Sequence, residues 1–592
     1  MRWAAPAAAL LLLCAAAPAL AATKPAATTT TPNLTFTAPP KVKPALTEAK
    51  VKKIFFAVPK VKDWVGRYPK KSLITEVTYD KTYKVWDIKV WSGPAGEIAA
   101  GRIDDLSSEP TAWTGPQVAW TMARGGRGAF GGKTINSYGV WLAFCAVFFI
   151  GLADLRRWRS LRNLDLLMLL SFTFSLWYFQ QGRIFSSVSW VYPGLVYLLA
   201  RTVWIGIRDR PPPTSRPLWP VWVLAAATVF LGGFKVGLNV WGHSNVIDVG
   251  YAGPIGAQRI VNGQSPYGHF PVEDSRPNCP GALADREGEV RERIQTNGRC
   301  ESANPNGDTY GPMSYIAYIP GYLMFGWSGH WDKLPAAHFT AIAFDLLCLI
   351  GLALVGWRFG RERLAVTLAF AWAAYPFTQY VSSSNTNDSI MPAFLIWGFW
   401  LSTSHWARGF FGGLAGWTKF AALIVAPLWA TYPERNKKSS LKFVGGFALA
   451  TAASFWVLLL EPNPLHAART FWDRTIPTQI DRHSPFSLWD WAQYHAGLPD
   501  LHILQQVLEV ALVAAAIAAA FWPRRKSPLQ LAALTGALLI GFEIVLTHWF
   551  YLYLPWFFGF AAYAVLSGEP QAEEALATEP DERPARELVT AG

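Results

Sequence analysis

An aspartate stands where a long apolar segment of the chain ends. Asp248 lies in "VIDVGYAGPIGAQRIVNGQSPYGHFP", residues 246–271, among small and apolar residues. A carboxylate at a membrane surface can accept a proton from an attacking hydroxyl group, so one interpretation of Asp248 is a general base. The other interpretation, which spacing alone slightly favours, is a helix-terminal aspartate that accepts hydrogen bonds from backbone N–H groups.

Side chains that suit a phosphate group recur near the ends of other apolar segments. A phosphate is stabilised by fixed positive charge and by hydrogen-bond donors. The candidates are Arg259, Arg482, His483 and His548. Each also has a structural interpretation: Arg259 can reach lipid head groups, Ser484 can cap a helix beside Arg482 and His483, and His548 opens an aromatic-rich segment typical of a membrane interface.

Lys419 lies inside an apolar stretch. A lysine in mid-bilayer costs about 2.5–3.5 kcal/mol, so its side chain should face a cavity or a charged partner. Asp345 and Glu543 also lie inside apolar stretches and are candidate partners. For these two acids a structural ion pair is the preferred interpretation. For Lys419 an ion pair and contact with a phosphate are equally favoured.

The composition indicates a membrane protein rather than a nucleic-acid-binding one. Of 592 residues, 52% are hydrophobic and only 16% charged. The net charge of +13 comes from short basic clusters between apolar runs, a pattern that orients membrane spans. About thirteen apolar stretches approach the ~20 residues that cross a bilayer: residues 138–155, 164–181, 188–206, 218–241, 311–327, 336–357, 364–381, 389–405, 411–430, 441–460, 503–522, 529–547 and 549–566.

The fold class is therefore predicted as mainly α, a polytopic transmembrane helical bundle with a small N-terminal α+β domain outside the cytoplasm. Residues 1–21 resemble a secretory signal peptide, and residues 22–47 have the composition of a disordered linker. Residues 48–135 are expected to form a helix followed by a hairpin, and they resemble PepSY-like exported domains. The glycine-rich "GGRGAFGG", residues 125–132, is interpreted as a flexible link.

The remaining boundaries follow from the apolar stretches and the basic loops. We expect four transmembrane helices in 138–241, an extracytoplasmic loop in 242–310, a transmembrane core in 311–566 and a disordered cytoplasmic tail in 567–592. Asp248 then lies on the outer side of the cytoplasmic membrane. Arg358, Arg361 and Arg363 conflict with strict alternation, which a re-entrant segment at 311–327 or 411–430 would repair. The side on which Ser382–Asp388 lies stays open.

Short motifs after residue 218 occur in the order of a known family. Asp248 and Tyr251 are followed by "NGQSPYG", "YGP", "NTND" and "GGLAGWTKFAALIVAPLW". In this the chain resembles integral-membrane glycosyltransferases of the GT-C fold, most closely family 87, which uses polyprenyl-phosphate mannose. The resemblance covers roughly Leu218 to Leu566.

This resemblance implies an inverting transfer of a sugar, mannose in the family, from a polyprenyl-phosphate donor to a glycan or glycolipid assembled outside. Asp248 would be the general base. The residues expected to bind substrate are Tyr251, Arg259, Tyr267, Tyr310, Lys419, Arg482, His483 and His548. Cys279 and Cys300 share one polar loop and can form a disulfide if that loop faces an oxidising compartment. No motif calls for a cofactor or metal, and no nucleotide-binding motif is present.

Two other functions are compatible with parts of the sequence. A transporter or flippase of a lipid-linked glycan also needs many spans and buried charges, but no inverted repeat is evident. A membrane sensor would use the exported domain to bind its ligand or partner. The enzyme hypothesis, in contrast, predicts that residues 22–135 can be removed with transfer partly retained.

Overall fold

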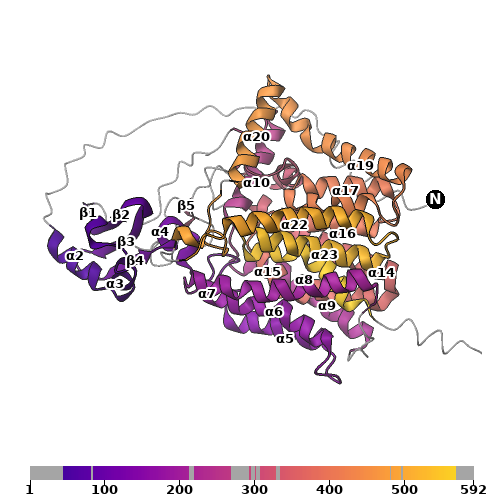
Figure 1. Cartoon of the computed structure of the whole chain (residues 1–592), viewed down its shortest axis with the longest axis horizontal. Helices are drawn as coiled ribbons and strands as arrows, with labels where there is room; N and C mark the ends of the chain where they lie inside the picture. The colour runs from indigo at the N-terminus through magenta and orange to yellow at the C-terminus, as the bar shows by residue number, and fades with distance from the viewer. Residues whose placement is uncertain are drawn as a thin grey trace, which may run out of the picture.

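A small sheet domain lies beside a large helical bundle (Figure 1). The computed structural model describes residues 44–81, 84–211, 219–268, 293–294, 300–301, 307–327, 334–480, 482–494 and 498–568. The predicted signal peptide, most of the predicted linker, nearly all of the tail and Cys279 lie outside these residues, as does the side chain of Cys300. The disulfide therefore stays a prediction.

The sheet domain is an antiparallel meander of four strands with two helices on one face. Its strands pair in chain order and are β1 (Leu73–Asp80), β2 (Val85–Ser92), β3 (Glu97–Asp104) and β4 (Pro110–Thr114). Phe55 and Val61, which come from helices α2 (Glu48–Ala57) and α3 (Pro59–Val65), are fully buried together with Ile88 and Ile103 of the sheet. The predicted hairpin is present as β2 and β3. The single helix expected at the start is two helices, because Pro59 interrupts the run.

The bundle contains most of the remaining helices. These are α5 (Tyr138–Leu152), α6 (Leu161–Phe179), α7 (Ile184–Ser189), α8 (Val191–Arg208), α9 (Val221–Trp241), α10 (Asp248–Val261), α12 (Met313–Ile316), α13 (Ile319–Phe325), α14 (Pro335–Ala374), α15 (Pro376–Ser383), α16 (Ile390–Trp400), α17 (His405–Gly416), α18 (Ala426–Ala430), α19 (Lys437–Phe455), α20 (Pro464–Ile480), α21 (Trp491–Tyr494), α22 (His502–Phe521), α23 (Pro528–Val545) and α24 (Leu554–Leu566). Short 3-10 turns include η3 (Thr121–Arg124), η4 (Phe420–Val425), η5 (Trp456–Leu460) and η6 (Tyr551–Tyr553), and β5 (Arg293–Ile294) pairs with β6 (Cys300–Glu301).

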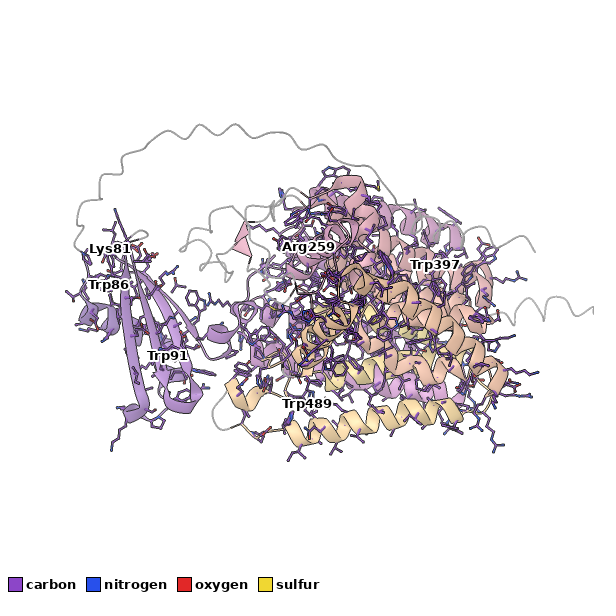
Figure 2. All side chains as sticks on the ribbon, turned by 90° about the horizontal axis from the view of Figure 1, so that it is seen from above. Lys81, Trp86, Trp91, Arg259, Trp397 and Trp489 are labelled. Atoms are coloured by element: carbon purple, nitrogen blue, oxygen red, sulfur yellow. The ribbon has the colours of Figure 1, made fainter. Side chains whose placement is uncertain are left out.

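Six helical segments of the described chain are long and apolar enough to cross a membrane. Four further apolar helical segments are shorter, between 10 and 17 residues. The chain is thus mainly helical, as predicted, but the count of about thirteen spans is not confirmed. Figure 2 shows the sheet domain, with Lys81, Trp86 and Trp91, apart from the bundle, in which Arg259, Trp397 and Trp489 are labelled.

Helix α14 is two antiparallel arms joined by a tight turn. Gly360 and Arg361 have non-helical backbone angles, with φ of −153° and 60°. A Cβ on Gly356 would lie 2.4 Å from the Cα of Ala365, and Trp372 Nε1 donates to Asp345 Oδ1 at 2.9 Å. The chain therefore reverses at this turn, which carries the basic cluster of Arg358, Arg361 and Arg363.

Most basic loops of the bundle lie at the same end as this turn. Arg358 donates to the carbonyl of Trp400. Arg408, which follows Trp400 closely in the sequence, donates to the carbonyl of Tyr432. Further bonds join Lys526 N to Pro433 O at 2.7 Å and Gln530 Nε2 to Gly206 O at 2.9 Å. We call this the Arg358 end. Strict alternation of spans conflicts with the positions of Arg358, Arg361 and Arg363 only if residues 313–325 cross the membrane. These residues form two short helices, of which α13 extends only about 10 Å.

Two helices end early at the opposite end of the bundle. Asp388 precedes α16 and Lys419 follows α17, and these helices of 11 and 12 residues reach only about 17–18 Å from the Arg358 end. The segment Lys437–Leu460 has 24 residues and extends about 36 Å. Because α16 and α17 stop short of their neighbour, Asp388 and Lys419 lie well below the outer rim.

Candidate active site

The start of α10 is held against a buried turn formed by residues 382–388. Asn245 N donates to Ser383 O at 3.1 Å, and Asn385 Nδ2 donates to Asn245 O at 2.6 Å. Asn385 has a left-handed backbone, with φ of 51°. A Cβ on Gly250 would lie 2.0 Å from Asn385 O, so only glycine allows this approach. The turn and Asp248 therefore lie at the same end of the molecule, and the side of the membrane on which Ser382–Asp388 lie stays a prediction.

Asp248 is the first residue of α10 and its carboxylate is partly exposed. Its Oδ1 accepts a hydrogen bond from the N–H of Val249 at 2.8 Å, and no cation of the described chain forms an ion pair with it. Burial raises the pKa of Asp248, while this backbone bond and the charges of Arg482 and Lys419 lower it. The helix-terminal interpretation is thus correct for the location, and it leaves the second carboxylate oxygen available for chemistry.

Lys419 forms an ion pair with Asp388. The Nζ atom lies 3.0 Å from Asp388 Oδ1, and the two side chains are 10% and 1% exposed. Asp388 also accepts from Trp556 Nε1 at 3.2 Å and from Thr386 Oγ1 at 2.6 Å. A buried carboxylate with this many partners can hold a buried ammonium group.

The two partners suggested for Lys419 by the sequence were wrong. Asp345 lies 2.9 Å from the Nζ of Lys235, so it is a structural ion pair elsewhere in the bundle. Glu543 accepts from Trp549 Nε1 at 2.9 Å and forms no ion pair with any residue that the structure describes. Hydropathy places all four charges inside apolar segments but cannot say which of them face one another.

Three aromatic rings surround the ammonium group of Lys419. Its Nζ lies 4.8 Å from the ring centre of Tyr310, 5.4 Å from Trp556 and 5.8 Å from Tyr553. Tyr553 and Trp556 stack on each other at 4.2 Å. Cation–π contacts stabilise a desolvated cation without neutralising it. The three rings thus act with Asp388 to hold the ammonium group of Lys419 at this position.

Arg482 contributes a second cation, held by His548. Its Nη2 lies 3.1 Å from His548 Nε2, and His548 Nδ1 lies 2.9 Å from Ser484 Oγ. Arginine can only donate, so Nε2 accepts and Nδ1 carries the proton, which it donates to Ser484. Burial and the charge of Arg482 lower the pKa of His548, in agreement with this neutral form. Within the described part of the chain, Arg482 forms no ion pair with a carboxylate.

Tyr310 is positioned by a buried scaffold beneath the site. Tyr267 donates its hydroxyl to Tyr310 O at 2.8 Å and is itself 3% exposed. Asp308 accepts a hydrogen bond from Gly268 N at 2.8 Å and forms an ion pair with Arg474 at 2.7 Å. Tyr267 thus supports the loop that bears Tyr310.

The structure brings together five of the expected site residues: Asp248, Tyr310, Lys419, Arg482 and His548, which influence one another electrostatically. Tyr251 and Tyr267 are buried supports. Two candidates are not in the cluster. Arg259 lies at the other end of α10, about 16 Å from Asp248 along the helix axis, and bonds Gln264 at 3.1 Å. His483 is 66% exposed and faces Asp490, 3.4 Å away.

Sequence reasoning missed several members of the cluster. Asp388 was noted only as part of the "NTND" motif, and Trp556 and Tyr553 were assigned to an apolar span. The signal for Asp388 was its place in that motif beside an intramembrane lysine. Trp120, which contacts His548, had no signal, because it lies in the range assigned to the exported domain, residues 48–135. Within the described ranges, His, Cys, Asp and Glu form no group of three able to hold a metal ion.

Comparison with known proteins gives one family. Neither the curated proteins nor the solved structures include a significant match to this chain. The model described as glycosyltransferase family 87 matches residues 309–547. The matched part contains Tyr310, Asp388, Lys419 and Arg482; Asp248 and the sheet domain precede it, and the PepSY-like resemblance stays a prediction. Over residues 309–547 the chain is therefore similar to glycosyltransferase family 87, as its motifs predicted, and this indicates a membrane glycosyltransferase.

Proposed function

We propose that the protein transfers a hexose, mannose by the family resemblance, from a polyprenyl-phosphate donor to a glycan or glycolipid acceptor outside the cytoplasm. The observation that carries this proposal is that a partly exposed aspartate without an ion pair among the described residues lies near Arg482, a cation that likewise has no carboxylate partner among them. Asp248 lies within electrostatic reach of both Arg482 and Lys419. A donor phosphate needs the cations, and an acceptor hydroxyl needs the carboxylate.

The reaction is a single displacement with inversion. An acceptor oxygen forms a bond to the anomeric carbon of the donor sugar while the bond from that carbon to the phosphate oxygen breaks. The hydroxyl proton goes to Asp248, and the lipid phosphate leaves with the bonding electron pair. Arg482 supplies positive charge to this leaving group, and the field of Lys419 adds to it.

The early ends of α16 and α17 and the charge distribution support a lipid-linked donor. A phosphate that enters from the outer rim can reach Arg482 while its isoprenoid chain stays among the apolar surfaces of the bundle. The basic loops at the Arg358 end favour a cytoplasmic location of that end by the positive-inside rule. The Asp248 end then faces the extracytoplasmic side of the cytoplasmic membrane.

The test supplies the purified protein with radiolabelled polyprenyl-phosphate mannose and membrane glycolipids. We expect labelled glycolipid from wild type and at least a hundredfold less from Asp248→Asn, because general-base catalysis contributes about 10²–10⁴-fold. Asp473→Asn, which changes an exposed aspartate of α20 whose partner among the described residues is the exposed Arg469, is the matched control and should retain wild-type transfer. Equal labelling by wild type and Asp248→Asn would remove Asp248 as the base.

A further inference from the structure

The segment between the sheet domain and the first helix of the bundle is packed, not flexible. Asn245 Nδ2 donates to the carbonyls of Gly128 and Ala129, both at 2.7 Å. Phe130 is 8% exposed, and its ring lies 4.7 Å from that of Phe550. Gly132 has φ of +84°, and a Cβ there would lie 1.9 Å from His243 O. We call Pro116–Gly132 the connecting segment. It contacts His243 and Asn245, which come shortly before Asp248 in the sequence, and Phe550, which comes shortly after His548.

Trp120 of this segment reaches the candidate active site itself. Its ring stacks on His548 with centres 5.4 Å apart and planes 26° apart. The guanidinium carbon of Arg482 lies over the same ring at 5.7 Å. The indole N–H donates to the hydroxyl of Tyr494 at 3.1 Å, which fixes the orientation of the ring.

Trp120 and His548 together position Arg482 and leave its charge intact. The imidazole accepts one guanidinium N–H through Nε2, so the arginine is held by a neutral group. The indole adds a cation–π contact, which also leaves the positive charge unpaired. An arginine that pairs with a structural carboxylate does not need neutral partners. An arginine that binds an incoming anion needs them, because they hold the guanidinium group and leave its charge unpaired.

The sheet domain in turn fixes Trp120. Arg124 lies over the ring of Trp113 in β4 at 3.9 Å, and its Nε donates to Gln117 O at 3.1 Å. Gln117 Nε2 donates to Gly182 O of the bundle at 3.1 Å. Trp64 of α3 also stacks on Phe185 of α7, with centres 6.3 Å apart and planes 10° apart. Contacts therefore lead from the sheet through the connecting segment to Arg482.

We propose that Trp120 is a positioning residue for Arg482, and that the sheet domain belongs to the catalytic unit of this protein. The sheet domain and the connecting segment lie outside the matched family region. The expected effect on binding of a lipid-phosphate donor rests on the proposed function. The geometry of Arg482 can be measured without that function. It also reverses the sequence-based expectation that residues 22–135 can be removed with transfer partly retained.

The experiment compares Trp120→Ala, Trp120→Phe and Trp91→Ala in the full-length protein. Trp91 is an exposed tryptophan of β2 and serves as the matched control. In the transfer assay, Trp120→Ala should raise KM for polyprenyl-phosphate mannose about tenfold, the size of a desolvated cation–π contact, and change kcat by less than about threefold. Trp120→Phe should restore most of the loss, because a phenyl ring keeps a π face. Trp91→Ala should match wild type.

A second measurement separates this inference from the proposed function. Modification of Arg482 by phenylglyoxal, followed by mass spectrometry, needs no substrate. We expect it to be several-fold faster in Trp120→Ala than in wild type or Trp91→Ala. Absence of transfer in wild type would overturn the proposed function alone. Unchanged Arg482 modification in a folded Trp120→Ala protein would overturn the positioning role, even if transfer is observed. If Trp120→Ala does not fold, the same comparison is made with Trp120→Phe and Trp120→Leu.

Discussion

Lys419 Nζ lies 3.0 Å from Asp388 Oδ1, and neither side chain belongs to a long membrane-spanning helix. Lys419 follows α17, and Asp388 closes the turn before α16. These two short helices pack side by side, and their ends away from the Arg358 end carry the charge pair. Polar backbone at this depth is tolerated because protein surrounds it.

Removal of the Asp388 charge should destabilise the protein more than removal of both charges. Asp388→Asn leaves a buried ammonium without its counter-ion, a loss of about 3–5 kcal/mol in the free energy of unfolding. Lys419→Met combined with Asp388→Asn removes the charge as well as its partner and should recover part of that loss. Unfolding of the two single variants and the double variant in a double-mutant cycle measures the coupling. Additive losses would show that the pair contributes no interaction energy.

The pH dependence of transfer should report the environment of Asp248. Burial raises its pKa, so the acidic limb of kcat/KM should lie above the ordinary aspartate value of about 3.9. The base is active when deprotonated, so activity is lost as the pH falls through the raised pKa. The charge of Arg482 lowers this pKa, and Arg482→Gln should therefore move the limb to higher pH. A limb that moves downward would contradict the assigned geometry.

Gly250→Ala should separate α10 from the turn at Asn385. A Cβ at this position would lie 2.0 Å from a backbone carbonyl, which cannot move aside as a flexible side chain can. We expect overpacking of about 1–3 kcal/mol and at least a tenfold loss of transfer. Gly232→Ala in α9 is the control, because an added Cβ there meets nothing within 4 Å. Thermal unfolding and transfer rates of both variants test this prediction.

The hydroxyl of Tyr267 should matter less than its ring. Tyr267→Phe removes the bond to Tyr310 O but keeps the edge-on contacts with Tyr315 and Phe471. One such hydrogen bond contributes about 0.5–1.5 kcal/mol. Tyr267→Ala also opens a cavity and should cost about 3–5 kcal/mol. Stability that is equal in the two variants would show that the ring does not support the loop.

The topology can be tested by labelling single cysteines from either side of the membrane. Asn262→Cys lies after α10 and Glu362→Cys lies in the turn of α14, and both positions are exposed. In a background without native cysteines, a membrane-impermeant maleimide should reach position 262 from outside in intact cells. It should reach position 362 only after permeabilisation. Labelling of both from the same side would contradict the separation of the two ends.

Local patterns predicted the elements better than their assembly. Apolar length identified the helical segments because lipid demands continuous apolar surface, and alternation identified β2 and β3 because one sheet face is buried. The turn at Arg361 could not be predicted, because nothing in the sequence marks this non-glycine residue for a positive φ. The pairing of Lys419 with Asp388 depends on how α16 and α17 pack. Glycines 125–132 indicated flexibility, yet Gly132 serves close approach to His243.

The contact between Trp120 and His548 also constrains how the molecule is made. Its two partners lie at opposite ends of the bundle's sequence, one before the first helix and one just before the last. Insertion proceeds from the N-terminus, so the early ring must wait until nearly the whole polypeptide has been synthesised. Arg482 is consequently held in its final position only in the last stage of assembly, so a truncated, half-inserted product would lack the arrangement that we propose for donor binding.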